Sequence, residues 1–83
     1  MSGATINLLY FARVAELTGK RNEAWPMSEP TTGAQLLDAL QARYPDLAPA
    51  SRLKLAINQT HSRASATIQP GDEVAIFEPV TGG

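Results

Sequence analysis

The residues best suited to chemistry in this chain form its last segment, EPVTGG, at positions 78–83. Gly82 and Gly83 have no Cβ atoms, so their backbone can pass through a channel that any side chain would block. The α-carboxyl group of Gly83 has a pKa near 3.3–3.7 and is ionised at neutral pH. Held in line, a carboxylate attacks the α-phosphate of ATP and forms a mixed anhydride with a good leaving group. A thin tail of this kind on a rigid domain suits transfer between active sites.

Outside this tail, no group of side chains suggests a catalytic or metal site. Cysteine is absent and His61 is the single histidine, so the chain has no thiolate ligands and too few imidazoles for a typical zinc site. We expect His61 to be an ordinary surface residue. Asp72 and Glu73 follow a Pro-Gly pair and are expected to be solvated charges in a turn. Trp25 is expected to pack in the core.

The composition indicates one globular domain that folds without disulfides. The chain has 83 residues, of which 43% are hydrophobic and 18% are charged, and this length is too short for two cores. The formal net charge is −1 and the seven basic residues are scattered, which argues against a nucleic acid as partner. No run approaches the roughly 18 apolar residues that cross a membrane, and the N-terminus lacks the basic start of a signal peptide. We therefore expect a cytoplasmic protein that binds neither nucleic acid nor membrane.

The first half of the chain predicts two strands and two helices that position the tail. Residues 5–11 (TINLLYF) are apolar on both faces, as in a central strand. A short helix follows and ends at Gly19, while residues 21–27 contain a proline and predict an edge strand. The clearest helix covers residues 32–44, which begin with the T-x-x-Q spacing of a capping box and stop before a proline. Its apolar stripe comprises Leu36, Leu37, Leu40 and Tyr44.

Two strands in the second half complete the predicted fold. Residues 52–58 alternate between apolar and polar, and residues 73–80 form the last strand after a Pro-Gly turn. Residues 62–68 show no clear pattern. The order of elements predicts an α+β fold in which one main helix packs across one face of a mixed β-sheet, with the first and last strands parallel.

Three stretches of the chain are similar to a known family: INLLYFARVAELTG (6–19), LAINQ (55–59) and GDEVAIFEPVTGG (71–83). Together they resemble the small subunit of molybdopterin synthase, a ubiquitin-like β-grasp sulfur carrier. The resemblance implies a β-grasp domain at residues 1–78 and a flexible Gly-Gly tail at residues 79–83. Family tails commonly read Pro-Pro-Val, and Glu78 stands here in place of the first proline. This departure implies a less rigid lead-in to the tail.

The resemblance implies that Gly83 is the catalytic position of a heteromeric sulfurtransferase, without catalytic side chains in this subunit. An ATP-dependent activating enzyme would adenylate its carboxyl group, and a sulfur donor protein would convert the adenylate to a thiocarboxylate. Thr81 and Gly82 would thread the tail into partner active sites. In the large subunit of the synthase, two such tails would supply the two dithiolene sulfurs that turn cyclic pyranopterin monophosphate into molybdopterin. The family complex is a heterotetramer, and no cofactor is expected to stay bound to the small subunit.

Docking to partners is expected on the face of the sheet that the main helix leaves free. Phe11 and Phe77 are predicted to lie on that face and are candidates for an apolar docking patch. Pro79 and Val80 are the adjoining docking candidates. The alternative is that the two aromatic side chains fill a second small core.

Three alternative functions remain open. A related sulfur carrier for thiazole synthesis, in the thiamine pathway, shares the fold, the Gly-Gly end and the activation chemistry. A ubiquitin-like protein modifier would instead join Gly83 to lysines of target proteins. A plain interaction module would make no use of its tail. The segments LYFARVAELTG and EPVTGG favour the molybdopterin synthase family.

Overall fold

The computed structural model describes residues 4–49 and 52–79. Its elements in chain order are β1 (Thr5–Tyr10), α1 (Ala12–Thr18), β2 (Asn22–Pro26), β3 (Thr31–Thr32), α2 (Gly33–Arg43), β4 (Lys54–Ile57), β5 (Thr60–Ser62), β6 (Thr67–Ile68) and β7 (Glu73–Phe77). All elements predicted from the sequence are therefore present.

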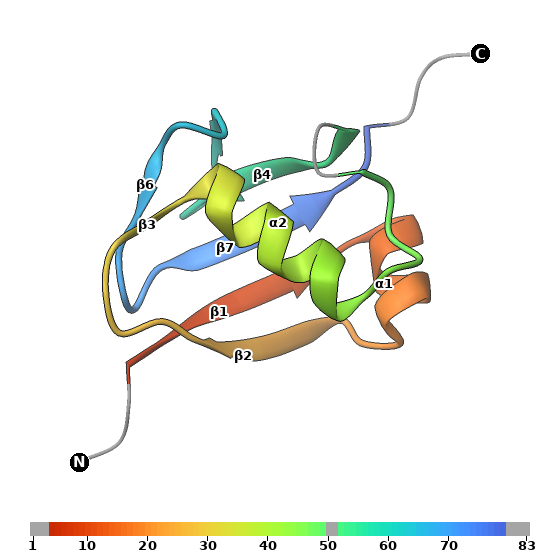
Figure 1. Ribbon diagram of the computed structural model, residues 1–83, viewed down its shortest axis with the longest axis horizontal. Coiled ribbons are helices and arrows are strands. Elements are labelled where there is room, and N and C mark those ends of the chain that lie inside the picture. Colours follow the sequence, from red (N-terminus) through yellow and green to blue (C-terminus); the bar gives the residue numbers. More distant parts are fainter. Residues whose placement is uncertain (1–3, 50–51, 80–83) are drawn as a thin grey trace.

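Within the described ranges, five strands form one mixed sheet and two form a separate small sheet. The order in the larger sheet is β2-β1-β7-β4-β5, and β3 pairs with β6. β1 and β7 are parallel, as predicted, whereas β1 with β2, β4 with β7 and β4 with β5 are antiparallel. α2 lies across one face of the larger sheet (Figure 1). The last strand, β7, therefore runs through the middle of the sheet, and the predicted α+β architecture is confirmed.

The main helix begins and ends where the sequence predicts. The Thr32 side chain accepts a hydrogen bond from the Gln35 backbone N–H at 3.2 Å, and the Gln35 side chain accepts one from the Thr32 N–H at 3.1 Å. These two bonds form the predicted capping box, which satisfies backbone donors that a helix start leaves open. At the other end, the Tyr44 N–H donates to the Leu40 carbonyl, and Pro45 follows. Local sequence therefore sets both ends of α2.

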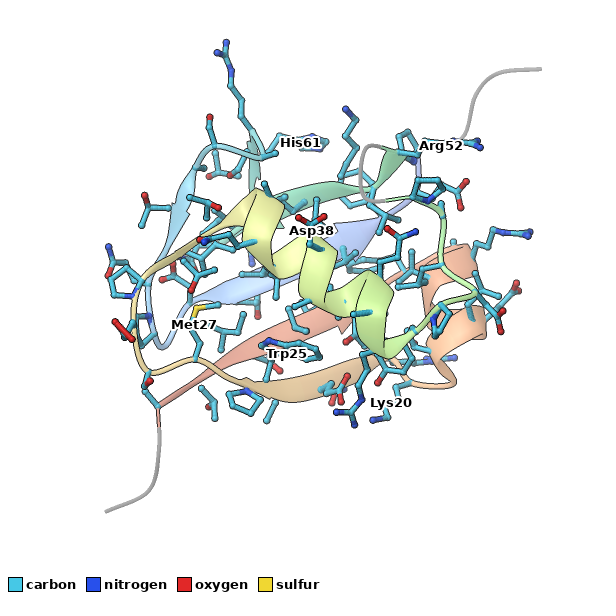
Figure 2. The ribbon with its side chains drawn as sticks, in the orientation of Figure 1. Lys20, Trp25, Met27, Asp38, Arg52 and His61 are labelled. Carbon is cyan, nitrogen blue, oxygen red and sulfur yellow. The ribbon has the colours of Figure 1, made fainter. Side chains whose placement is uncertain are left out.

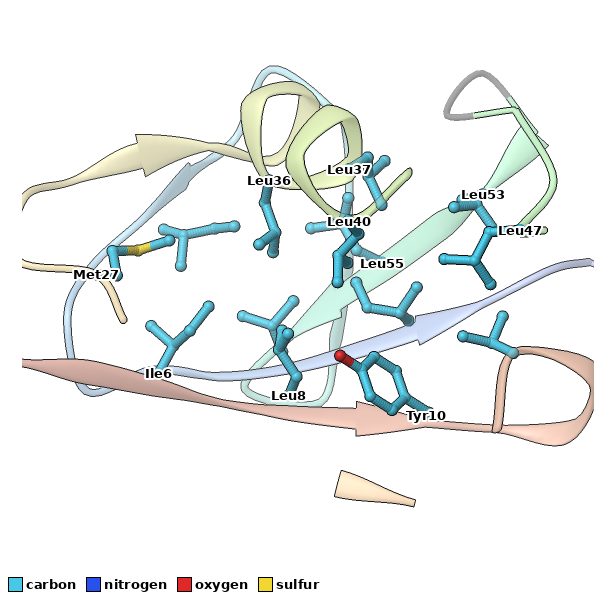
Figure 3. Close-up of a cluster of buried hydrophobic side chains, with 14 residues drawn as sticks. Ile6, Leu8, Tyr10, Met27, Leu36, Leu37, Leu40, Leu47, Leu53 and Leu55 are labelled. Atoms are coloured by element: carbon cyan, nitrogen blue, oxygen red, sulfur yellow. The ribbon is translucent and has the colours of Figure 1, made fainter. Parts of the chain in front are cut away.

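Among the described residues, a cluster of buried hydrophobic side chains forms the core between α2 and the sheet (Figure 3). From α2 it takes Leu36, Leu37 and Leu40, all nearly inaccessible to solvent. The other buried members of this cluster are Ile6, Leu8, Tyr10, Val14, Met27, Leu47, Leu53, Leu55, Ile68, Val74 and Ile76. Trp25 packs against the cluster from the edge strand β2, as predicted. Burial of this apolar area is the main force that holds the sheet and helix together.

Three short strands were not predicted from the sequence. β3, β5 and β6 contain only two or three residues each, too few for an alternation of apolar and polar side chains to be visible. The last strand is shorter than predicted, since β7 ends at Phe77 rather than at residue 80. Residues 80–83 lie outside the described residues, so the division into a domain and a flexible tail remains a prediction.

Candidate functional site

The predicted reactive tail begins where β7 ends. Glu78 and Pro79 are the first two residues after this strand, and Pro79 is exposed. The other predicted tail residues lie outside the described part of the chain: Val80, Thr81, Gly82 and Gly83. Because β7 is flanked by β1 and β4, the chain reaches Glu78 from the middle of the sheet. The described residues therefore include Glu78 and Pro79, which we call the tail root, and the surface around them.

The outer face, which we define as the side of the five-stranded sheet away from α2, carries a row of three apolar side chains that ends in a histidine. Leu9 pairs with Ala75, Ala75 with Ala56, and Ala56 with His61. Residues paired across strands point to the same side of a sheet, so this row crosses β1, β7, β4 and β5. The Ala75 and Ala56 side chains in the middle of the row are short. They therefore project less far from the sheet than the Leu9 and His61 side chains at its two ends. The outer face is therefore shallow and mainly apolar along this row.

Phe77 and His61 stand together at one end of the row. The two ring centroids are 5.3 Å apart and the rings meet edge to face at 67°. Phe77 is half-buried, while His61 is exposed. The sequence predicted an ordinary surface role for His61 and missed this contact. Asn58 and Gln59 form a two-residue turn between β4 and β5, and such a hairpin pattern is the signal that pairs His61 with Ala56.

Phe11 lies on the other side of β7 from His61. Its backbone N–H donates to the Ile76 carbonyl at 3.4 Å, which places it beside the end of β7. Its side chain is 50% exposed, and no other large hydrophobic side chain of the described residues is classed as exposed. Phe11 lines an open hollow of about 800 Å³ between β1 and α1. Phe11 and Phe77 thus both lie next to the C-terminal end of β7, where the tail begins. Their docking role remains a prediction.

Glu78 is held between two arginine side chains. Its Oε1 atom lies 3.8 Å from Arg13 Nε, and its Oε2 atom lies 3.5 Å from Arg52 Nη2. Arg13 belongs to α1, which follows β1, and Arg52 precedes β4. Figure 2 shows Arg52 beside the end of β7. The family resemblance implied a looser lead-in at this position, whereas the structure places a cation on each side of it.

A second polar cluster lies at the edge of the sheet formed by β2, around Glu23. Tyr10 and Tyr44 donate hydrogen bonds to its Oε1 atom at 2.7 and 2.9 Å, and Lys20 Nζ lies 3.0 Å from Oε2. Burial, together with the adjacent carboxylate, raises the pKa of Tyr10. Partial burial acts to raise the pKa of Glu23, but the hydrogen bonds from Tyr10, Lys20 and Tyr44 outweigh it and hold the pKa below its ordinary value. Every polar group in this cluster has a partner within it, so it links β1, β2 and α2 rather than offering a site.

Asn58 and Asp72 also serve the fold. Asn58 has a left-handed φ of 51° at the β4–β5 turn. Its amide donates to Asp72 Oδ1 at 3.1 Å and accepts from the Glu73 backbone N–H at 3.0 Å. The Gln69 N–H donates to the other Asp72 oxygen at 2.9 Å. The predicted turn is therefore present, and the Asp72 side chain is hydrogen-bonded within it rather than only solvated.

The part of the chain that the structure describes contains no cluster of three or more His, Asp or Glu side chains that could hold a metal ion. None of its helices is long and apolar enough to span a membrane. What it offers is an apolar row on the outer face, two aromatic side chains near that row, and a tail root between two cations.

The chain is similar to known proteins over most of its length. The chain matches the ThiS family over residues 8–83. A curated protein of Homo sapiens named molybdopterin synthase sulfur carrier subunit is 33% identical, and the match covers 94% of this chain and 93% of that protein. A protein of the same name from Arabidopsis thaliana is 37% identical over 99% of this chain and 86% of the other. The crystal structure of H. volcanii small archaeal modifier protein 1 has a TM-score of 0.75 at 26% identity, over 94% of this chain and 100% of that one.

Proposed function

Because the chain belongs to the ThiS family, we propose that it is the sulfur carrier subunit of a molybdopterin synthase. The relatives confirm the family resemblance that the sequence motifs indicated, and the similar structures confirm a ubiquitin-like β-grasp fold. The observation that carries the proposal is identity of 33% and 37% to proteins of that name over nearly the whole of both chains.

The proposed chemistry takes place at the backbone carboxyl group of Gly83. Its carboxylate attacks the α-phosphate of ATP on an activating enzyme, and pyrophosphate leaves. A sulfur donor protein then supplies sulfur at the oxidation level of hydrosulfide, which attacks the acyl carbon. The bond from that carbon to the AMP oxygen breaks, AMP leaves, and a thiocarboxylate remains on Gly83. The sulfur is a far better nucleophile than a carboxylate oxygen, so the loaded tail can transfer it to a cyclic pyranopterin phosphate. The sulfur then joins Gly83 to the pterin as a thioester. Hydrolysis of the bond between the Gly83 carbonyl carbon and the sulfur leaves the sulfur on the pterin and returns the carboxylate, which can be loaded again. Two loaded tails complete one dithiolene.

The proposed docking places the outer face against the large subunit of the synthase. Phe11 and Phe77 border the tail root, and the row of small side chains beside Phe77 gives a partner an apolar surface to cover. Pro79 and Val80 would adjoin the same interface, while Thr81 and Gly82 would enter the active site. Aromatic anchors at the centre of an interface supply much of its binding energy. The proposed docking surface would thus lie next to the start of the tail, so docking would bring the tail to the active site of the large subunit.

The second candidate function is that of a protein modifier. It is favoured by the likeness to small archaeal modifier protein 1, whose name states that role. In this alternative the adenylate of Gly83 would be attacked by a lysine amine of a target protein, which forms an isopeptide bond. The thiazole sulfur carrier shares the activation steps and differs in its acceptor.

Three measurements test the proposal. Incubation with an activating enzyme, ATP and a sulfur source, followed by intact mass, should show the exchange of one oxygen for sulfur. Addition of the large subunit and the cyclic precursor should then yield molybdopterin. Copurification with the large subunit should accompany product formation. A thiocarboxylate without molybdopterin would favour the thiazole carrier, and covalent adducts to lysines without a thiocarboxylate would favour the modifier.

A further inference from the structure

Glu78 has a setting that the proposed function does not by itself explain. It follows the last residue of β7 and precedes Pro79. Only 19% of its side-chain surface is exposed, although it stands outside the strand. A carboxylate this poorly solvated needs compensating charge, and Arg13 and Arg52 provide it at 3.8 and 3.5 Å.

The two arginines approach Glu78 from opposite sides of β7. Arg13 lies in α1, the element after β1, and Arg52 lies two residues before the start of β4. β1 and β4 are the two neighbours of β7 in the sheet. A swing of the Glu78 side chain toward either neighbour therefore lengthens its ion pair with the arginine on the other side. The arrangement opposes rotation of the chain about the point where it leaves the sheet.

These ion pairs are poorly placed to stabilise the fold as a whole. The Arg13 and Arg52 side chains are 69% and 64% exposed, and exposed ion pairs contribute little to global stability. Glu78 also lies after the last strand, so its loss removes no strand pairing. The two ion pairs of Glu78 therefore act locally, by restricting the first residues of the tail. Pro79 extends it by one residue, because the proline ring fixes φ near −65°.

We propose that Glu78 is a positioning residue that, held between Arg13 and Arg52, aims the C-terminal tail toward the active site of whichever partner has docked. This inference rests on the proposed function of the tail. An aimed tail samples fewer directions before it enters a narrow channel, so less conformational entropy is lost on entry. Glu78 touches neither substrate nor Gly83 in this proposal and acts only through the direction of the chain.

The test compares Glu78→Gln with Glu29→Gln, a matched control. Both substitutions remove one negative charge, and Glu29 is an exposed residue between β2 and β3. Thiocarboxylated protein is titrated against the large subunit and cyclic precursor, and KM and kcat are measured separately. We expect Glu78→Gln to raise KM about threefold to tenfold, an effect that the loss of two surface ion pairs can supply, with kcat unchanged. Glu29→Gln should match the wild type.

Two further arms separate positioning from a general charge effect. An Arg13→Gln/Arg52→Gln double variant should raise KM as Glu78→Gln does, and adding Glu78→Gln to it should change nothing more. Raising salt from about 0.05 M to about 0.5 M, which shortens the range of exposed charges, should raise KM of the wild type and of Glu29→Gln but not of Glu78→Gln. The heteronuclear ¹H–¹⁵N NOE of the Glu78 amide should fall in Glu78→Gln and in the arginine double variant.

The proposal is overturned if Glu78→Gln and Glu29→Gln have equal KM values, or if Glu78→Gln lowers Tm and kcat together. It is also overturned if the arginine double variant behaves as the wild type. A wild-type protein that forms no product would contradict the proposed function instead. In that case the NOE of the Glu78 amide still decides whether the arginines hold this residue.

Discussion

At the scale of single residues, the molecule separates reactivity from recognition. The proposed reactive group is a backbone carboxyl, which needs no side chain, and the proposed recognition groups are side chains in the domain. Phe11 is half exposed and Phe77 is half-buried against His61. Under the proposed function, partners that differ in chemistry would share one docking surface, because that surface carries no catalytic requirement.

The first prediction concerns Phe77. We expect Phe77→Ala to weaken binding of the large subunit by about 2 kcal/mol or more, since truncation of a buried aromatic anchor commonly has this effect. Isothermal titration of the folded variant measures it, and Phe11→Ala should show a smaller loss. A dissociation constant equal to that of the wild type would remove Phe77 from the interface.

The second prediction concerns the two glycines. Deletion of Gly83 shortens the reach of the tail by about 3.3–3.6 Å, and misplacement by about 1 Å can lower a rate on the order of a hundredfold. We therefore expect this variant, and separately Gly82→Leu, to form almost no molybdopterin. Melting curves and large-subunit affinity should stay close to those of the wild type. Product at the wild-type rate from the deletion variant would disprove the sulfur-carrier proposal.

At the scale of elements, the edge strand β2 is secured by one carboxylate. Glu23 connects β2 to β1 through Tyr10 and to the C-terminal end of α2 through Tyr44. Edge strands pair on one side only and need additional contacts to stay in place. The side chain of Glu23 is 12% exposed, so its hydrogen bonds are largely shielded from water.

The third prediction follows from the lowered pKa of Glu23. A carboxyl group whose folded-state pKa is depressed stabilises the fold above its unfolded-state pKa, and this contribution is lost as the pH falls through the folded value. We expect Glu23→Gln to lower the free energy of unfolding by about 1–2 kcal/mol at pH 7. The difference should shrink as the pH falls from the ordinary value of 4.5 through the lowered one. Urea unfolding at several pH values measures it, and a difference independent of pH would contradict the assignment.

At the scale of the whole molecule, one core must hold a domain of only 83 residues without a disulfide. Domains of this size have small net stability, on the order of 5–10 kcal/mol. Binding of a partner to the folded state alone adds to that stability in proportion to the logarithm of partner concentration. The proposed complex would therefore stabilise the carrier as well as use it.

The fourth prediction tests this dependence on the core. Leu40 of α2 is fully buried in the core (Figure 3), and Leu→Ala at such a position costs about 2–5 kcal/mol. We expect Leu40→Ala to melt well below the wild type and to recover part of its Tm in excess large subunit. Asp38→Ala, on the exposed side of the same helix (Figure 2), should change stability by less than about 0.5 kcal/mol. A large loss for Asp38→Ala would contradict this account of α2.

Local patterns determined much of this protein. The capping box at Thr32, the leucine stripe of α2 and the apolar run of β1 each depend on neighbours in sequence, so periodicity and capping rules were enough to predict them. The tail and its proposed chemistry came from the types and order of the last residues and from their family resemblance. Those residues lie outside the described structure, so for them the sequence remains the source of the prediction.

Tertiary structure decided the relations between residues that are far apart in the chain. His61 meets Phe77 because β4 pairs with both β5 and β7, and Glu23 meets Tyr44 across 21 positions. Arg13, Arg52 and Glu78 come together only because β7 is inserted between β1 and β4. Sequence spacing cannot predict such contacts, since they depend on strand order and register, which long-range packing sets. The family resemblance implied that Glu78 loosens the start of the tail. Because of the strand order, the fold instead places Glu78 between the Arg13 and Arg52 side chains.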